Sequence, residues 1–402
     1  MSNLVLEDET NVATLILLPA ANDRELSAWG WACASYAQAF DTITVSNNPL
    51  EARRETYQAV IVVQPDFWPA SLWEAITPAR RPGLIVERLE APTPDILAQI
   101  LKARVVHEVR FADSALRNAA ANLLSDWLVG LHARGDGELQ PYDLTAFRVG
   151  RINAAKILSY ATPASIEALR NLNPNMFIMV RAIINFNNNG KAQRVTPREF
   201  FDETAPNLDR LFAADPNLKY VEIHNEPNLV LEGLTGAWQN GTEWAEWFLE
   251  VKRLYSERWP GKLYGFPGLS PGPDLPGVRR DHQVFLREAF LSVVAADWIG
   301  VHTYWQNERE MLDEAHGMGF RLYRRLFPDQ LLLITEFGNP VEPKPVVGAQ
   351  YVRYYSQLAR ERGVGGAFAY ISSISDRRES ARWAWMRDDG SDVGIAPVVG
   401  SR

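Results

Sequence analysis

The sequence predicts an α/β protein of two parts, a small doubly wound domain over residues 1–124 and a C-terminal (β/α)8 barrel over residues 125–402. Short apolar runs alternate with helical patterns along the chain, as in parallel α/β folds. From residue 125 onward this alternation occurs eight times, the repeat number and the approximate size of a (β/α)8 barrel. The length of 402 residues also exceeds what one compact core usually holds.

Residues 1–124 show the pattern of a small flavodoxin-like or Rossmann-like domain. Four apolar runs without in/out alternation are expected to form parallel strands covered on both faces: residues 13–20, 42–46, 59–65 and 83–90. Neither G-x-G-x-x-G nor G-x-x-x-x-G-K-[ST] occurs in this part, so it lacks the loops that cradle nucleotide phosphates. We therefore expect a structural or docking domain without chemistry of its own.

Residues 125–402 contain eight apolar runs separated by helical patterns. The predicted strands are residues 126–132, 155–160, 176–183, 219–226, 262–267, 297–302, 331–337 and 366–372. One intervening segment, residues 242–259, spaces its apolar side chains as on one face of a helix, which places Trp244 and Trp247 in the core. An open sheet of eight strands is the alternative to a closed barrel.

Composition and charge exclude several classes of function. The net charge of −8 and the isoelectric point near 5.4 disfavour a nucleic-acid partner, because phosphate backbones are bound by clustered Lys and Arg. Cys33 is the only cysteine, so neither an intramolecular disulfide nor a thiolate metal site is expected. The apolar run at 13–21 is too short to span a bilayer and follows acidic residues. We therefore expect a cytoplasmic protein without a signal peptide or a membrane partner.

Polar and aromatic side chains gather at the predicted ends of the barrel strands. In (β/α)8 barrels the chemistry lies on the face where strands end and loops begin. The residues at or near these ends are His132, Arg134, Arg181, His224, Asn225, Glu226, His302, Tyr304, Trp305 and Glu336. The sequence therefore predicts a functional site at the C-terminal face of the barrel.

Alternation along a strand predicts which of these side chains point into the barrel mouth, because residues two apart share a face. On the fourth strand it groups His224 with Glu226, and on the seventh it groups Ile334 with Glu336. The two glutamates are thus expected to face each other. On the sixth strand His302 shares a face with Tyr304 two residues later, and both are expected to reach the same space.

Two carboxyl groups across a pocket are what the cleavage of a glycosidic bond requires. One is held protonated and donates to the leaving oxygen, while the other attacks the anomeric carbon or activates water. A single glutamate at a strand end serves about as often as an ion-pair partner or a helix cap. Two of them among aromatic loops favour catalysis over either structural role.

The motifs around these glutamates resemble those of clan A, a large group of retaining glycoside hydrolases with a (β/α)8 barrel. In that clan an Asn-Glu pair, commonly Asn-Glu-Pro, ends the fourth strand and a second Glu ends the seventh. This chain has VEIHNEPN at 221–228 and LLLITEFGNP at 331–340, supported by GVHTYW at 300–305 and WAW at 383–385. The resemblance covers residues 125 to about 390 and does not single out one family of the clan.

The resemblance implies roles for the matching residues. Glu226 would be the general acid/base and Glu336 the nucleophile of a retaining mechanism. Asn225 would bind the hydroxyl beside the reacting carbon, and Tyr304 or His302 would orient the nucleophile.

Arginine and tryptophan positions are less sharply defined by the resemblance. Either Arg134 or Arg181 would match the arginine that the clan carries on its early strands. Trp383 or Trp385 would form the platform for a sugar ring. Pyranose rings pack their C–H faces on flat aromatic surfaces, so tryptophans in the loops after the strands are consistent with a carbohydrate substrate. Trp238, Trp305, Trp383 and Trp385 all follow predicted strands and are the candidates.

Three other functions fit parts of the same pattern. The first is a metal-dependent hydrolase, for which His132, His224 and His302 are the candidate ligands. No HxH pair or HExxH helix is present, and HEVR at 107–110 lacks the second histidine, so we expect neither a metal nor another cofactor. The second is a barrel that binds carbohydrate without cleaving it, and the third is a transglycosylase that uses the same two glutamates.

Overall fold

The computed structural model describes residues 12–106, 109–112, 127–136 and 138–402. The chain divides into two compact units, one up to Asp126 and one from Trp127 to Ser401. The domain boundary predicted at 124/125 lies outside the described residues.

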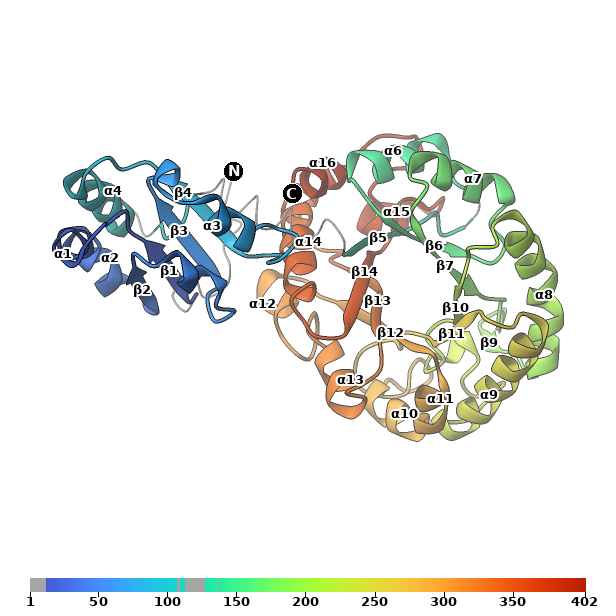
Figure 1. Ribbon diagram of the computed structural model, residues 1–402. Coiled ribbons are helices and arrows are strands. Elements are labelled where there is room, and N and C mark those ends of the chain that lie inside the picture. The colour runs from blue at the N-terminus through green and yellow to red at the C-terminus, as the bar shows by residue number, and fades with distance from the viewer. Residues whose placement is uncertain (1–11, 107–108, 113–126, 137) are drawn as a thin grey trace. The chain divides into compact units, whose positions relative to one another are not determined.

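The first unit is a parallel four-stranded sheet with helices on both faces, as predicted (Figure 1). Its strands are β1 (Thr14–Leu17), β2 (Ile43–Ser46), β3 (Ala59–Val63) and β4 (Ile85–Leu89), in the order β2-β1-β3-β4. Its α-helices are α1 (Asp23–Ala32), α2 (Ala34–Ala39), α3 (Ala70–Ala75) and α4 (Pro94–Val106). Ile16 and Ile61 pack in one hydrophobic cluster with α1, α2 and α4, and Leu15 and Val60 in a second with α3. Alternating strand residues therefore bury both faces of the sheet.

The second unit is a closed barrel of eight parallel strands, so the prediction of a barrel is confirmed and the open-sheet alternative is wrong (Figure 1). The strands are β5 (Leu128–His132), β6 (Ala154–Leu158), β7 (Phe177–Ala182), β10 (Tyr220–Ile223), β11 (Leu263–Phe266), β12 (Trp298–Tyr304), β13 (Leu332–Gly338) and β14 (Val364–Ala369). Pairing of β14 with β5 closes the ring. Each strand overlaps one of the eight predicted strands.

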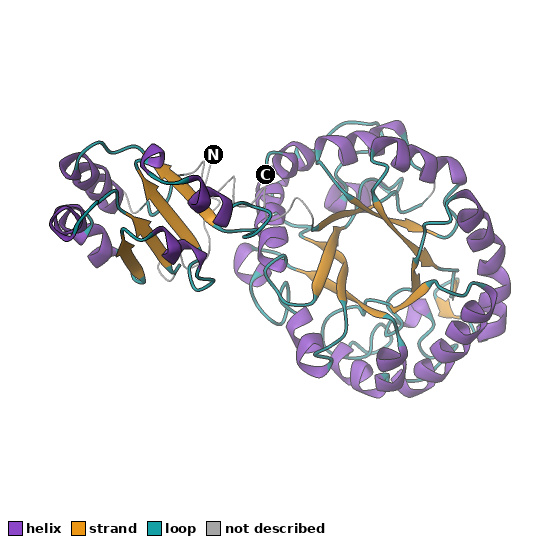
Figure 2. Ribbon diagram, viewed as in Figure 1, coloured by secondary structure: helices purple, strands orange, loops and turns teal. Residues whose placement is uncertain are grey.

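Helices surround the barrel (Figure 2). They are α6 (Pro141–Val149), α7 (Pro163–Leu172), α8 (Pro197–Ala214), α9 (Gly241–Arg258), α10 (His282–Glu288), α11 (Phe290–Ala295), α12 (Glu308–Met311), α13 (Phe320–Leu326), α14 (Lys344–Leu358), α15 (Arg377–Trp383) and α16 (Ile395–Gly400). The side chain of Thr196 caps α8 by accepting from the backbone N–H of Glu199. Helix α9 buries Trp244 and Trp247 in its apolar stripe, as predicted. None of the described helices is both long and apolar enough to cross a membrane.

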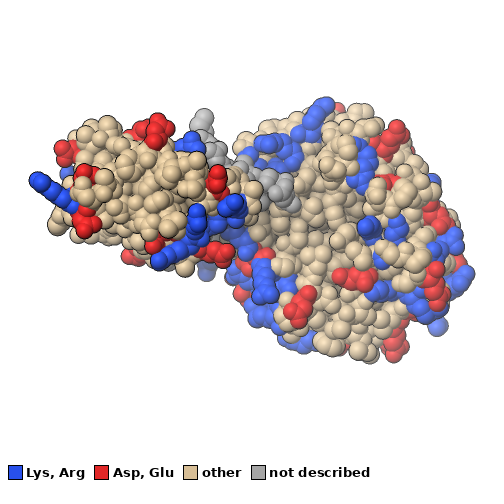
Figure 3. Space-filling model, viewed as in Figure 1, with Lys and Arg blue, Asp and Glu red and all other residues tan. Residues whose placement is uncertain are grey.

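Shorter elements lie in the loops of this unit. Strands β8 (Asn187–Asn188) and β9 (Lys191–Ala192) form a small hairpin, and η4 (Val230–Glu232) is a 3-10 turn after β10. On the barrel face shown in Figure 3, Lys and Arg are interspersed with Asp and Glu around the rim, and the middle is largely uncharged.

The barrel interior changes from apolar to charged along its axis. Ala154 and Trp298, the first residues of β6 and β12, pack with Met179, Leu333 and Phe368 in a buried apolar cluster. Two residues further along β6, on the same face of the strand, stands the fully buried Lys156. The apolar layer therefore supports a layer of charges nearer to the C-terminal strand ends.

Candidate active site

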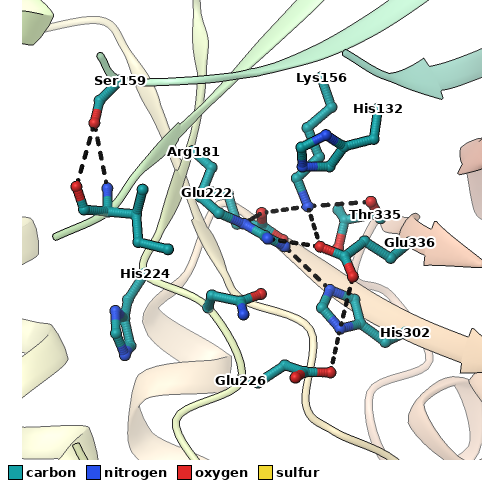
Figure 4. Close-up of polar contacts among 12 residues, drawn as sticks. His132, Lys156, Ser159, Arg181, Glu222, His224, Glu226, His302, Thr335 and Glu336 are labelled. Carbon is teal, nitrogen blue, oxygen red and sulfur yellow. Dashed lines mark hydrogen bonds and ion pairs between the residues drawn. The ribbon is translucent and has the colours of Figure 1, made fainter. Parts of the chain in front are cut away.

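Barrel strands bring charged side chains together near the C-terminal end of the barrel (Figure 4). Arg181 lies near the end of β7, Glu222 within β10, His302 within the second half of β12 and Glu336 near the end of β13. Glu226 follows the last residue of β10 by three positions. This is the end of the barrel at which the fold places chemistry.

A buried ion network joins two cations to two carboxylates. Arg181 contacts Glu336 Oε1 through Nη1 at 2.6 Å and Glu222 Oε2 through Nε at 2.6 Å. Lys156 Nζ lies 2.8 Å from the same Glu222 oxygen and 3.3 Å from Glu336 Oε1. All four residues are buried. Since an unpaired buried charge is costly, the balance of two cations against two anions is what allows these charges inside the barrel.

The network lowers the pKa of both carboxyl groups. Burial alone would raise the pKa of Glu336. The N–H side of the His302 ring, which faces the carboxyl group, and the cations of Arg181 and Lys156 outweigh burial, so this pKa lies well below its usual range. Burial is likewise outweighed at Glu222 by the charges of Arg181 and Lys156, and the pKa of Glu222 is lowered too. Both groups are therefore carboxylates at neutral pH.

A β-bulge in β13 turns Glu336 into the barrel. The pairing register of β13 shifts against both β12 and β14 around Thr335. Leu333 packs in the interior cluster, which leaves its neighbour Ile334 for the helix-facing side. The predicted shared face of Ile334 and Glu336 is therefore wrong, and the extra residue of the bulge is what brings Glu336 to the predicted space.

Tyr304 and His302 approach the second oxygen of Glu336. The Tyr304 hydroxyl donates to Glu336 Oε2 at 2.6 Å, and His302 Nδ1 lies 3.7 Å from the same oxygen. On the other side of the ring, Arg181 Nη2 lies 3.2 Å from His302 Nε2. Because a guanidinium can only donate, Nε2 accepts and the ring proton is on Nδ1. His302 therefore presents an N–H donor to the carboxylates.

The same nitrogen of His302 reaches Glu226. It lies 2.9 Å from Glu226 Oε1, so one imidazole N–H stands between the two glutamates. The two contacts limit the distance from Glu226 Oε1 to Glu336 Oε2 to at most about 6.6 Å, the sum of 2.9 and 3.7 Å. The side chain of Glu226 is 16% exposed and that of Glu336 is 7% exposed. Glu226 is thus the more accessible member of a close carboxyl pair.

The backbone turns sharply between β10 and Glu226. Ile223 is the last residue of β10, and His224 and Glu226 have φ values of 73° and 37°, in the left-handed region that residues with a Cβ rarely occupy. The Glu226 N–H donates to the carbonyl of Gly268 at 3.1 Å. This bond ties Glu226 to the loop after β11, and strand alternation does not extend past Ile223.

His224 consequently points away from the two glutamates (Figure 4). Its ring is buried among aromatic side chains. These are Phe186, Phe200, Trp238, Trp244 and Trp247. Burial lowers the pKa of His224 to about 3, so the ring is neutral at physiological pH. This corrects the expectations that His224 shares a face with Glu226 and contacts a substrate.

His132 lies at the end of β5, beside the charges of the network. It is buried, and its ring centroid is 5.5 Å from that of Tyr370. Burial, and to a lesser degree the charge of Lys156, lowers the pKa of His132 to about 3. His132 is therefore an uncharged side chain beside the ion network.

The two candidate arginines lie in different surroundings. Arg181 contacts Glu336 directly, whereas Arg134 pairs with Asp136 at 3.0 Å and with Asp388 at 3.1 Å. Arg134 therefore pairs with two loop residues, and of the two arginines Arg181 is the one that contacts Glu336.

The four candidate tryptophans differ in their exposure and in their distance from the site. Trp383 is half-buried, and its ring centroid lies 5.1 Å from that of Tyr304. Trp305 is 1% exposed and donates through Nε1 to Gln350. Trp238 and Trp385 are fully buried, which corrects the expectation that they offer a surface to a sugar ring. Only Trp383 of these four is both accessible and close to the site.

A cavity of about 640 Å³ adjoins the site. The loops that follow β11, β12, β13 and β14 form it, and Tyr304 and Trp383 are part of its lining. Tyr304, which lines the cavity, also donates a hydrogen bond to Glu336, whereas neither Glu226 nor Glu336 is itself part of the lining. Its remaining lining includes Arg279, His282 and Glu310.

The histidines that a metal site would need do not converge. His224 lies in the aromatic cluster, while His302 contacts Glu226 and Arg181. Within the described part of the chain, no group of three or more His, Cys, Asp or Glu side chains has an arrangement that could hold a metal ion. The HEVR stretch at 107–110 begins outside the described residues.

Sequence reasoning missed several residues that build the site. Lys156 lies within a predicted strand, and a lysine inside an apolar run was the available signal of a buried charge. Glu222 was expected on the barrel-facing side of the fourth strand, but no role in the site was predicted for it. Gly268 gave none, yet a Cβ there would lie 2.1 Å from the His302 ring. Glu232 also went unnoticed, although it accepts a hydrogen bond from the side chain of Asn225.

In fold, the chain is similar to several solved structures whose names describe glycoside hydrolases. Among solved structures, it resembles a GH128 subgroup II endo-β-1,3-glucanase from Sorangium cellulosum (16% identity, 68% of this chain and 96% of that chain, TM-score 0.46). It also resembles a GH128 subgroup VI exo-β-1,3-glucanase from Aureobasidium namibiae (14%, 66% and 93%, TM-score 0.43). A GH5_18 protein from Streptomyces cattleya, solved with GlcNAc, is a third (13%, 68% and 79%, TM-score 0.48).

No protein-family model matches the chain, and no curated protein matches it either. At the identities and TM-scores of the solved structures, the similarity carries no argument for substrate or mechanism. The proposed substrate class and mechanism rest on the contacts of the site.

Proposed function

We propose that this protein is a retaining glycoside hydrolase that cleaves an O-glycosidic bond of an oligo- or polysaccharide by double displacement. The observation that carries the proposal is the His302 nitrogen that stands 2.9 Å from Glu226 and 3.7 Å from Glu336. Retaining enzymes use carboxyl groups about 5–5.5 Å apart, and inverting enzymes need about 6.5–9.5 Å to admit a water molecule. The upper limit on the distance between these two oxygens favours the retaining arrangement.

Glu336 is the proposed nucleophile. It is ionised because nearby positive charge outweighs its burial, and Tyr304 and Arg181 each hold one of its oxygens. Attack by a carboxylate oxygen on the anomeric carbon breaks the C–O bond to the leaving group and forms a glycosyl ester. A carboxylate fixed on both sides enters this step in one orientation.

Glu226 is the proposed general acid and base. Its carboxyl proton passes to the glycosidic oxygen as that bond breaks. The resulting carboxylate accepts the Nδ1–H of His302, then takes a proton from the water that attacks the anomeric carbon. This second step frees Glu336, restores the Glu226 acid and gives net retention. The greater exposure of Glu226 fits its contact with both the leaving group and water.

The adjoining cavity is the proposed place for sugar units. Its volume of about 640 Å³ falls within the range of about 300–1,000 Å³ that small-molecule sites occupy. Trp383 offers a flat apolar face for a pyranose ring, and the hydroxyl of one ring is expected to bind Asn225.

A screen with aryl glycosides and polysaccharides tests the function. Wild-type protein is expected to cleave at least one substrate with retention, measured by NMR of the first product anomer. Glu336→Ala and Glu226→Ala are expected to reduce turnover by several orders of magnitude. Glu167→Ala, which removes an exposed carboxylate on α7, is the matched control and should keep full activity.

Added azide separates the two roles. In Glu226→Ala it should restore turnover and yield a glycosyl azide of retained configuration, because the small anion attacks the ester where water no longer can. Wild-type turnover that persists unchanged in both alanine variants would overturn the site assignment. Sugar binding without cleavage would instead identify a non-catalytic barrel, and transfer to an added sugar in preference to water would identify a transglycosylase.

A further inference from the structure

A third carboxyl group, that of Glu232, lies beside the proposed catalytic pair. It belongs to η4, the turn that follows the Asn225-Glu226-Pro227 segment, and its side chain is 23% exposed. Its Oε1 accepts a hydrogen bond from Nδ2 of Asn225 at 3.1 Å. Nothing in the proposed reaction uses this group.

The aromatic cluster around His224 holds Glu232 in place. His224 is neutral and donates through Nε2 to the backbone carbonyl of Glu232 at 2.7 Å. The next residue, Gly233, has φ of 113°, and a Cβ there would lie 2.7–2.8 Å from side-chain atoms of Trp238 and Phe186. Only glycine fits that position, so the backbone after Glu232 is fixed by packing. The buried histidine of the motif therefore anchors the turn that carries Glu232.

Asn225 is the residue on which Glu232 acts. Its amide oxygen is buried and makes no hydrogen bond, and its amide nitrogen donates one N–H to Glu232. An amide nitrogen carries two N–H groups, so the second is left for a ligand. Glu232 thereby fixes the rotation of the amide next to Glu226, and with it the direction of the remaining donor.

The charge of Glu232 is sensitive to its surroundings. Burial raises its pKa to about 7, and the nearby carboxylates of Glu226 and Glu336 act in the same direction. The hydrogen bond from Asn225 and the charge of Arg181 oppose this rise. Near neutral pH, Glu232 therefore exchanges between a charged and an uncharged acceptor.

We propose that Glu232 is a positioning residue of the active site, which holds the Asn225 amide so that its free N–H binds a substrate hydroxyl. The kinetic effects that follow from this inference rest on the proposed glycoside hydrolase function. The hydrogen bond from Asn225 to Glu232 is expected to be stronger when Glu232 is ionised, because a charged acceptor binds an N–H more tightly than a neutral one.

Steady-state kinetics of five variants test the route through Asn225. Glu232→Ala should lower kcat/KM by roughly tenfold, and Glu232→Gln, which keeps a neutral acceptor, by less. In an Asn225→Ala background, Glu232→Ala should have no further effect. Additive losses would refute the route through Asn225. A loss in Glu232→Gln as large as that in Glu226→Gln would also refute it, because it would make Glu232 an acid in its own right.

A second measurement does not depend on activity. In protein labelled with ¹⁵N at asparagine, the side-chain NH₂ signals of Asn225, assigned by their absence from Asn225→Ala, should shift with a midpoint near pH 7. The shift should vanish in Glu232→Gln. A shift with no turnover of any glycoside would uphold the contact and reject the proposed function. Signals that do not titrate in the wild type would reject the inference itself.

Discussion

Replacing Lys156 by methionine tests the balance of charges inside the barrel. The lysine is fully buried and contacts both Glu222 and Glu336. Methionine keeps most of the chain length and removes the charge, which leaves two carboxylates to Arg181 alone. Breaking a buried ion pair from one side typically costs about 3–5 kcal/mol. For a unit of this size, that loss corresponds to a midpoint of thermal unfolding lower by roughly 10 °C.

Denaturant and thermal unfolding of Lys156→Met measure this loss, with Lys219→Met as the control. Lys219 is exposed and directly precedes β10, so its replacement should change the unfolding free energy by less than about 0.5 kcal/mol. The double variant Lys156→Met/Glu222→Gln restores one cation against one anion. It should be more stable than the sum of the single losses predicts, by about 0.5–3 kcal/mol.

The same variant predicts a pH effect with a definite sign. The charge of Lys156 helps to lower the pKa of Glu336, so its removal should raise that pKa. If Glu336 is the nucleophile, the acid limb of kcat/KM then moves to higher pH. A carboxyl group with a lowered folded pKa adds stability above its unfolded value of about 4.3, and this stability is lost as pH falls through the folded value. The stability difference between wild type and variant should therefore be largest at neutral pH and shrink in acid.

Two results would refute this reasoning. One is a Lys156→Met variant as stable as wild type at pH 7, which would mean that the carboxylates need no second cation. The other is strict additivity in the double variant, which would mean that Lys156 and Glu222 are not coupled.

Three further predictions concern the site. Tyr304→Phe should lower kcat/KM roughly 10- to 100-fold through loss of the bond to Glu336, as steady-state kinetics will show. Gly268→Ala should reduce kcat with the far-UV circular dichroism unchanged, because its Cβ would displace the ring of His302. Trp383→Ala should raise KM more than it lowers kcat, since the ring is expected to bind sugar away from the reacting bond.

Two of these changes, Gly268→Ala and Trp383→Ala, have a control variant. Gly30→Ala adds a Cβ at a helical glycine with no neighbouring atom within 4 Å, and should leave kcat unchanged. Trp385→Ala removes a fully buried ring and should cost about 3–5 kcal/mol of stability. An unaltered KM in Trp383→Ala, or full activity in Tyr304→Phe or Gly268→Ala, would contradict the corresponding role.

Much of the fold and the positions of the two glutamates could be predicted from the sequence. Parallel strands buried on both faces leave uninterrupted apolar runs, and these mark all eight strands of the barrel. Polar residues that follow such runs must lie on one face of the barrel, which is why Glu226 and Glu336 were found.

Side-chain directions were predicted less well, and the reason is local backbone geometry. Alternation holds only while the chain stays extended. It fails at His224, where φ becomes positive, and at Thr335, where an extra residue shifts the register. Neither event leaves a clear mark in the sequence. The burial of Trp385 was missed for a similar reason, because its place after a strand does not tell whether the loop folds back on the barrel.

The ion network also bears on how the chain assembles. Its four members lie on β6, β7, β10 and β13, so the cations at 156 and 181 precede the carboxylate at 336 by more than 150 residues of synthesis. Until β13 joins the barrel, two positive charges have only Glu222 as an internal partner, and a partly built barrel cannot bury them at low cost. The ion network is therefore complete only once β13 has joined the barrel, and a fragment that ends before β13 should keep these side chains in water.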